Sequence, residues 1–316
     1  MADALLIVSF GGPEGQDEVI PFLQNVVRGR NVPPGRLEEV ATHYRHFGGV
    51  SPINGQIRAL INAVTSELAA SRVDLAVYWG NRNWHPFLAE TIQQMADEGR
   101  RRALAFITSP YASYSGRRQY LEDIAAARAT VGARAPQVDE LPVFYNHPGF
   151  IGPNADNLRT ALAEAGSDAA VAFTAHSIPT AMPSSSEYVP QLMETARLVA
   201  ERAAAPDWRL VYQSRSGPPG EPWLEPDIGD HLRALAGAGI ERVVVAPIGF
   251  ISDHMEVLYD LDVEARATAE GLGLTFIRAP TVGTDPRFVA MIRQLVQEKL
   301  DPLDGSAPTP ATQDRR

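Results

Sequence analysis

The chain has 316 residues, of which 45% are hydrophobic, and it carries a formal net charge of −10 at pH 7. This length and composition can fill one large α/β domain or two domains of ordinary size, and the negative charge argues against broad nucleic-acid binding. Because the sequence contains no cysteine, disulfides, thiolate catalysis, cysteine-held zinc and cysteine-held iron–sulfur clusters are excluded.

The beginning of the chain leads directly into a strand-like run, without a basic and apolar leader. No apolar stretch approaches the ~20 residues that are needed to span a bilayer. We therefore expect a cytoplasmic protein.

Strand-like runs alternate with helical patterns along the first half of the chain. The first run, 4–10, ends in Gly11-Gly12-Pro13, which allows a ligand close to the backbone but is no dinucleotide-binding fingerprint. Helices are predicted over 17–27, 56–70, 86–98 and 119–130, and further strands over 73–79, 103–108 and 138–144.

A basic and aromatic region follows the first predicted helix. Cations interleaved with aromatic rings fit a flat ligand that carries carboxylates, because acids bind arginine and the ring face binds other rings. An ordinary solvated helix face with packing aromatics fits the pattern equally well. The cations available for such carboxylates are Arg28, Arg30, His43, Arg45, Arg117 and Arg118.

The same alternation begins again after residue 148. Strands are predicted over 169–173, 209–212, 242–246 and 274–278, with helices between them. Two runs of four βα units predict two similar doubly wound α/β halves with parallel sheets and a cleft between them. We place these halves at 1–148 and 149–300, with a disordered tail over 301–316. The loops 110–120 and 213–224, which close two of the strands, are predicted to bind ligand.

Three carboxylates follow the strand that ends near residue 246. Glu256, Asp260 and Glu264 are spaced by four, which places them along one side of the predicted helix. Such a row of like charges suits a divalent cation. The alternative is that Glu256 closes a capping box with Asp253 while the other two face solvent.

One histidine can complete a metal site with these carboxylates. His176 comes just after the predicted strand 169–173, where open α/β sheets place their ligands. A structural histidine that is merely hydrogen-bonded remains the alternative.

Six segments in order resemble the ferrochelatase family, in particular the coproporphyrin ferrochelatases of actinobacterial type. The resemblance extends from about Leu5 to Leu300 and rests on the segments 9–13, 46–52, 78–82, 174–179, 213–217 and 249–264. It implies two Rossmann-like domains around a porphyrin cleft, and insertion of Fe²⁺ into a tetrapyrrole, coproporphyrin III, in haem synthesis. The partners implied are the porphyrin and Fe²⁺, with no further cofactor.

The resemblance also implies roles for individual residues. His176 and Glu256 match the residues that hold the metal at the porphyrin, and Ser51 and Tyr120 match residues that contact the porphyrin. We further expect Phe10, His43, Tyr44, Arg45 and Arg28 to bind substrate, and Asp260 and Glu264 to continue the metal line as a hydrated path for Fe²⁺ and protons.

Two departures from the family pattern are visible. Some relatives present a tyrosine in the first loop that ligates iron from the opposite face, and here that position is Phe10. Many relatives carry a cysteine-held [2Fe–2S] cluster, which this chain cannot have.

Several alternatives remain open from the sequence. The chain could use protoporphyrin IX, or it could insert cobalt or nickel into another tetrapyrrole. It could also be a haem or metal carrier without catalysis. A sugar- or nucleotide-using enzyme is disfavoured by the missing phosphate-binding fingerprint. We expect a monomer and leave open transient contacts with neighbouring enzymes of haem synthesis.

Overall fold

A computed structural model describes residues 2–29, 32, 34–166, 168–182, 185–205, 207–216 and 220–301. The tail predicted from residue 301 therefore lies outside the described residues, apart from Asp301 itself. None of the helices in the described ranges is both long and apolar enough to cross a bilayer.

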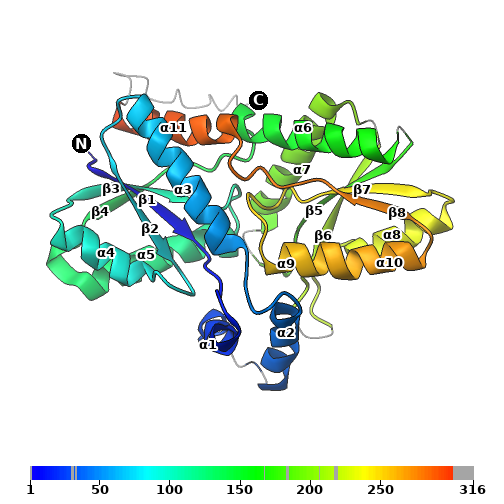
Figure 1. The fold of residues 1–316 in the computed structure, drawn as a ribbon, viewed down its shortest axis with the longest axis horizontal. Coiled ribbons are helices and arrows are strands. Elements are labelled where there is room, and N and C mark those ends of the chain that lie inside the picture. Colours follow the sequence, from blue (N-terminus) through cyan, green and yellow to red (C-terminus); the bar gives the residue numbers. More distant parts are fainter. Residues whose placement is uncertain are drawn as a thin grey trace, which may run out of the picture.

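Two parallel four-stranded sheets lie side by side, one in each half of the chain (Figure 1). The first has the order β2-β1-β3-β4, and the second repeats it as β6-β5-β7-β8. The first contains β1 (Ala4–Ser9), β2 (Ala76–Asn81), β3 (Arg102–Ile107) and β4 (Gln137–Glu140). The second contains β5 (Ala170–His176), β6 (Trp208–Gln213), β7 (Arg242–Ala246) and β8 (Thr275–Arg278). This arrangement confirms the predicted fold class.

Helices cover both faces of each sheet, so the central strands are largely buried, and β1 is buried at every residue. In β1, Leu5 and Ile7 face one core while Ala4, Leu6 and Val8 face another. The helices of the first half that lie against its sheet are α3 (Ile53–Ala70), α4 (Leu88–Asp97) and α5 (Gln119–Val131), with a short π-helix at η1 (Tyr114–Arg118) and a 3₁₀-helix at η2 (Gly132–Arg134). Those of the second half are α6 (Pro148–Ala165), α7 (Ser185–Ala203), α8 (Ile228–Gly237), α9 (Met255–Val257), η3 (Leu258–Ala265) and α10 (Arg266–Gly271).

Some predicted boundaries shift in the structure. The strand predicted over 138–144 ends at Glu140, shortly before Pro142, which has no N–H to continue a ladder. The strand predicted over 73–79 begins only at Ala76. The basic and aromatic region contains a helix of its own, α2 (Pro34–His46).

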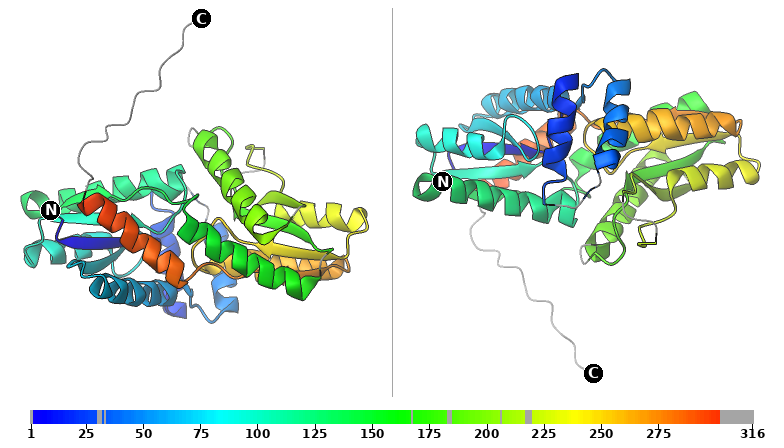
Figure 2. Two further views of the ribbon diagram at one scale, coloured as in Figure 1. Left: turned by 90° about the horizontal axis from the view of Figure 1, so that it is seen from above. Right: turned by 90° about the horizontal axis from the view of Figure 1, so that it is seen from below.

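The last helix, α11 (Pro286–Leu300), returns from the second sheet to the first half, where it lies against α3 (Figures 1 and 2). Arg293 on α11 pairs with Glu67 on α3 at 2.8 Å. One hydrophobic core continues through both halves and includes Leu5 of β1, Phe173 of β5 and Phe288 of α11. The linear division at residue 148 stays a prediction, and the packing makes the halves interdependent.

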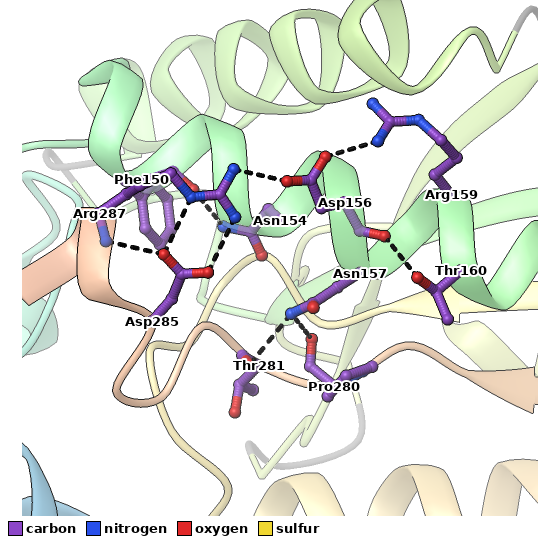
Figure 3. A network of polar contacts seen from close by, with 10 residues as sticks. All are labelled: Phe150, Asn154, Asp156, Asn157, Arg159, Thr160, Pro280, Thr281, Asp285 and Arg287. Atoms are coloured by element: carbon purple, nitrogen blue, oxygen red, sulfur yellow. Dashed lines mark hydrogen bonds and ion pairs between the residues drawn. The ribbon is translucent and has the colours of Figure 1, made fainter.

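A polar network fixes the segment from which α11 departs (Figure 3). The guanidinium of Arg287 contacts Asp285 at 2.8 Å and Asp156 of α6 at 2.5 Å. Asn157 donates from Nδ2 to the carbonyl oxygens of Pro280 and Thr281 at 3.0 and 3.2 Å. These contacts attach the loop between β8 and α11 to helix α6.

Helices α1 (Gln16–Val26) and α2 project away from the sheets near the boundary between the halves (Figure 1). They pack through a separate apolar cluster, the α1–α2 cluster. Its buried members are Val19, Phe22, Leu23, Ala41, Tyr44 and Met255. Since Met255 belongs to α9, this cluster joins the two projecting helices to the second half of the chain.

Candidate active site

His176 is the last residue of β5, and β5 lies where the strand order of the second sheet reverses. Ligands of open α/β sheets bind outside the carboxyl ends of strands at such a point. Tyr188 of α7 donates its hydroxyl to the His176 carbonyl oxygen at 3.1 Å and holds the backbone there. The ring nitrogen Nδ1 contacts the carbonyl oxygen of Ser177.

The loop after β7 brings Glu256 to His176. Gly249 donates its N–H to the Thr174 carbonyl oxygen at 3.0 Å, so the loop lies on the end of β5. A Cβ at Gly249 would come within 2.7 Å of the Ala175 Cα, and only glycine permits this approach. As a result, His176 Nε2 and Glu256 Oε2 are 3.8 Å apart, with side-chain exposures of 32% and 47%.

The helix carrying Glu256 begins differently from the sequence expectation. His254, not Asp253, is its N-cap, and His254 Nδ1 accepts from the Glu256 N–H at 3.2 Å. Asp253 accepts from both terminal nitrogens of Arg278 at 3.2 Å. The capping-box alternative is therefore wrong, because a partly buried arginine from β8 takes the carboxylate that would have capped the helix.

The helix also changes geometry after its first turn. Residues Leu258–Ala265 form a π-helix, in which each N–H bonds five residues back instead of four. Asp260 is half-buried and accepts a hydrogen bond from the Ser214 hydroxyl. Burial first, and then the negative charge of Glu256, raise the pKa of Asp260 to about 7.

Glu264 is the outermost of the three carboxylates and is exposed. Burial of part of the side chain, and then the charge of Asp227, raise its pKa above the usual range. Among the residues that the structure describes, no group of three or more histidine and carboxylate side chains is arranged as a ready metal site. The structure thus pairs His176 with Glu256 and sets Asp260 and Glu264 further along the helix.

Helix α2 places two of the predicted substrate residues, His43 and Tyr44, beside the helical segment 255–265 that carries the three carboxylates. The His43 ring stacks on the Tyr259 ring, with centroids 3.6 Å apart and an angle of 8°. Tyr44 is buried, and burial together with the charges of Glu256 and Asp260 raises its pKa.

The described arginines among the predicted cations, just after α1, on α2 and on η1, have partners already. Arg45 is exposed and pairs with Glu38 at 2.6 Å, and Arg28 donates to the Asn25 side chain. Arg117 forms two hydrogen bonds to Glu140, at 2.7 and 2.9 Å, and Arg118 pairs with Glu122 at 3.1 Å. Arg30 lies outside the described residues. To bind a substrate carboxylate, each described arginine must share or exchange its present partner.

Phe10 and Tyr120 both contact Arg82, a cation in the segment 78–82 to which the sequence analysis assigned no role. The Arg82 guanidinium lies 5.9 Å from the centre of the Phe10 ring and 4.6 Å from that of Tyr120. Tyr120 is buried, as is Ser51, which packs against Gly12 so closely that a Cβ at Gly12 would lie 2.7 Å from the Ser51 Cβ. A strand-end motif alone could have indicated Arg82, because it immediately follows β2.

Comparison with known proteins gives consistent matches over the whole chain. The family model described as Ferrochelatase matches residues 2–300. A Ferrochelatase of Rhodopirellula baltica is 54% identical over 306 residues, covering 96% of this chain and 87% of the relative. A Coproporphyrin III ferrochelatase of Streptomyces coelicolor is 52% identical and covers 98% and 88%, and one of Nocardia farcinica is 51% identical and covers 95% and 89%.

Solved structures support the fold. SirB from Bacillus subtilis, in a structure with Fe³⁺, has a TM-score of 0.57 at 11% identity and covers 95% of this chain and 98% of that one. CbiX, described as the terminal enzyme for biosynthesis of sirohaem in denitrifying bacteria, has a TM-score of 0.55 at 17% identity, with 93% and 98% covered.

Proposed function

The chain belongs to the ferrochelatase family, and from this premise we propose that it inserts Fe²⁺ into coproporphyrin III and releases two protons. The observation that carries the proposal is the approach of His176 to Glu256 in a chain that matches ferrochelatases over almost its full length. Relatives named for coproporphyrin III support this tetrapyrrole over protoporphyrin IX.

The contact of His176 Nδ1 determines which ring nitrogen of His176 is available to accept a proton. A carbonyl oxygen can only accept, so the Nδ1 that contacts the Ser177 oxygen carries the proton. In the neutral ring, Nε2 then presents a lone pair toward Glu256 Oε2. Two acceptors 3.8 Å apart lack a hydrogen between them, and this gap suits a pyrrole N–H proton or an incoming Fe²⁺ ion.

Metallation needs the macrocycle to lose two protons while Fe²⁺ loses its water. We propose that His176 accepts a proton or contacts the metal, and that Glu256 receives protons or ligates opposite it. Ring distortion in the cleft would direct pyrrole lone pairs toward the metal before the bonds form. Asp260 and Glu264, which continue along the helix, would form the hydrated path for Fe²⁺ and protons.

Initial rates of metallation under anaerobic conditions test the proposal. With Fe²⁺, we expect kcat/KM for coproporphyrin III to exceed that for protoporphyrin IX by at least about tenfold, because two additional carboxylates gain charge-assisted hydrogen bonds. Parallel assays with Co²⁺ and Zn²⁺ in place of Fe²⁺ test which metal ion the protein inserts. Equal rates for both porphyrins would contradict the substrate assignment. Tight product binding without acceleration over the free reaction would instead identify a carrier.

A further inference from the structure

The last residue of β6 and the residue after it form hydrogen bonds to the helical segment 255–265, which carries Glu256, Asp260 and Glu264. Gln213, the last residue of β6, is 1% exposed and donates from Nε2 to the Glu256 carbonyl oxygen at 3.1 Å. The next residue, Ser214, donates its hydroxyl to Asp260 Oδ2. Two consecutive side chains therefore hold two of the residues that carry the proposed metal chemistry.

The backbone of Ser214 is unusual for its position. Its φ is +64°, a left-handed conformation that residues with a Cβ seldom adopt. Among the described residues, the other non-glycine residues with positive φ are Arg72 and Ala204, which follow the ends of helices, where this conformation is common. Ser214 instead follows a strand, and the side chain placed there bonds Asp260.

The hydrogen bonding of the Gln213 side chain is incomplete. Its Oε1 is buried and has no hydrogen-bond partner among the described residues, although its Nε2 is bonded to the helix. A buried acceptor without a donor is unfavourable, and such groups gather where function requires them. This second observation indicates that the contact with the helix, rather than local stability, determines the position of the segment.

The helical segment 255–265 depends on contacts from outside the helix, such as those from Gln213 and Ser214. A π-helix is rarely stable by its own hydrogen bonds, and the half-buried carboxylate of Asp260 needs a donor. Without the Ser214 hydroxyl, Oδ2 of Asp260 would lose this hydrogen-bond donor.

We propose that Ser214 is a positioning residue for metal delivery, whose hydroxyl fixes the Asp260 carboxylate so that Asp260 and Glu256 present oxygen atoms to the same Fe²⁺ ion in transit. The inference rests on the proposed function, because it requires Fe²⁺ to pass Asp260.

Two substitutions separate the hydroxyl from the backbone conformation. Ser214→Gly removes the donor and adopts positive φ without strain, whereas Ser214→Asn keeps a donor and is also tolerated at positive φ. Ala204→Gly, at an exposed positive-φ position at the end of α7, is the matched control. We expect Ser214→Gly to raise KM for Fe²⁺ about tenfold, with kcat and the porphyrin KM within about twofold of the parent. Ser214→Asn should return KM for Fe²⁺ to within about threefold.

A double-mutant cycle with Asp260→Asn tests whether Ser214 acts through Asp260. Asp260→Asn should itself raise KM for Fe²⁺, and adding Ser214→Gly should then change it by less than about twofold. The inference is overturned if Ser214→Gly behaves like Ala204→Gly, if it lowers KM for Fe²⁺, or if both substitutions contribute fully in the double variant. These results leave metallation by the parent intact, whereas failure of the proposed function would abolish acceleration in the parent itself.

Discussion

Burial decides the charge state of single residues in this site. Asp260 is protonated in both the folded and the unfolded chain below about pH 4. Between pH 4 and about 7 the unfolded chain releases this proton while the folded chain keeps it, because burial raises the pKa of Asp260 to about 7 in the folded state. The stability of the parent therefore falls as pH rises through this window, and the loss is complete above it.

Asp260→Asn should remove this dependence. We expect the variant to have a higher free energy of unfolding than the parent by on the order of 2 kcal/mol at pH 8, and nearly the same value at pH 4. Urea unfolding at both pH values measures the difference. Asp230→Asn, at an exposed carboxylate of α8, serves as control. An equal effect of Asp260→Asn at both pH values would show that the buried charge is not responsible.

Residues placed by local rules could be predicted, and residues placed by tertiary contacts could not. His176 and Glu256 follow from a strand end and a helix start, which short segments of sequence reveal. The donor to Asp260 is Ser214, which lies 46 positions away on another loop. Asp253 looked like a cap because the sequence does not reveal that Arg278 reaches it.

At the scale of elements, Arg278 attaches β8 to two points of the segment that carries the site, one before Glu256 and one after it. It contacts Asp253 before α9 at 3.2 Å and Asp262 within the π-helix at 2.8 Å, and its side chain is 13% exposed. One guanidinium therefore sets the position of the loop and of the helix relative to the sheet.

Arg278→Ala should leave the partly buried Asp253 without its cation and Asp262 with only the longer pair to Arg266 at 3.6 Å. We expect a loss of about 3 kcal/mol in the free energy of unfolding, since removing one member of a buried ion pair leaves the other charge uncompensated. Arg242→Ala, which breaks an exposed pair with Asp168, should cost less than about 1 kcal/mol. Chemical denaturation of both variants provides the measurement, and equal losses would argue against the role of Arg278.

The sequence predicted that a helix follows β7, but it did not predict the π-helical form. A periodic pattern indicates a helix, whereas the choice between hydrogen bonds four or five residues back depends on external partners such as Gln213 and Arg278. For helix α2, the sequence offered a helix face only as an alternative and gave no bounds, for a related reason. It packs through the α1–α2 cluster with Met255, a residue more than two hundred positions away.

At the scale of the whole molecule, the two halves were predictable from the repeated alternation of strands and helices, but their shared core was not. Helix α11 leaves the second sheet and packs on α3, and Tyr111 of the first half donates its hydroxyl to the Ile248 carbonyl oxygen at 2.8 Å. Each half consequently buries surface of the other.

A fragment of residues 1–148 should therefore not fold cooperatively. Without α11, α3 loses the helix that packs beside it, and the shared core is left incomplete. We expect the full chain to unfold in one calorimetric transition, and the fragment to show none while binding a dye for exposed apolar surface. A cooperative transition of the fragment at the temperature of the full chain would contradict this.

The central claim is that one imidazole and one carboxylate act together on the macrocycle. The most direct measurement is anaerobic metallation of coproporphyrin III by Fe²⁺ with the parent, His176→Ala, Glu256→Gln and, as control, His85→Ala, at an exposed ring that lies near Glu90 and against the rings of Trp84 and Phe87. We predict that kcat falls by at least about a hundredfold in each of the first two variants and stays at the parent value in the third, in line with the usual contribution of acid–base catalysis. Parent-like turnover by His176→Ala in a folded protein would contradict the account.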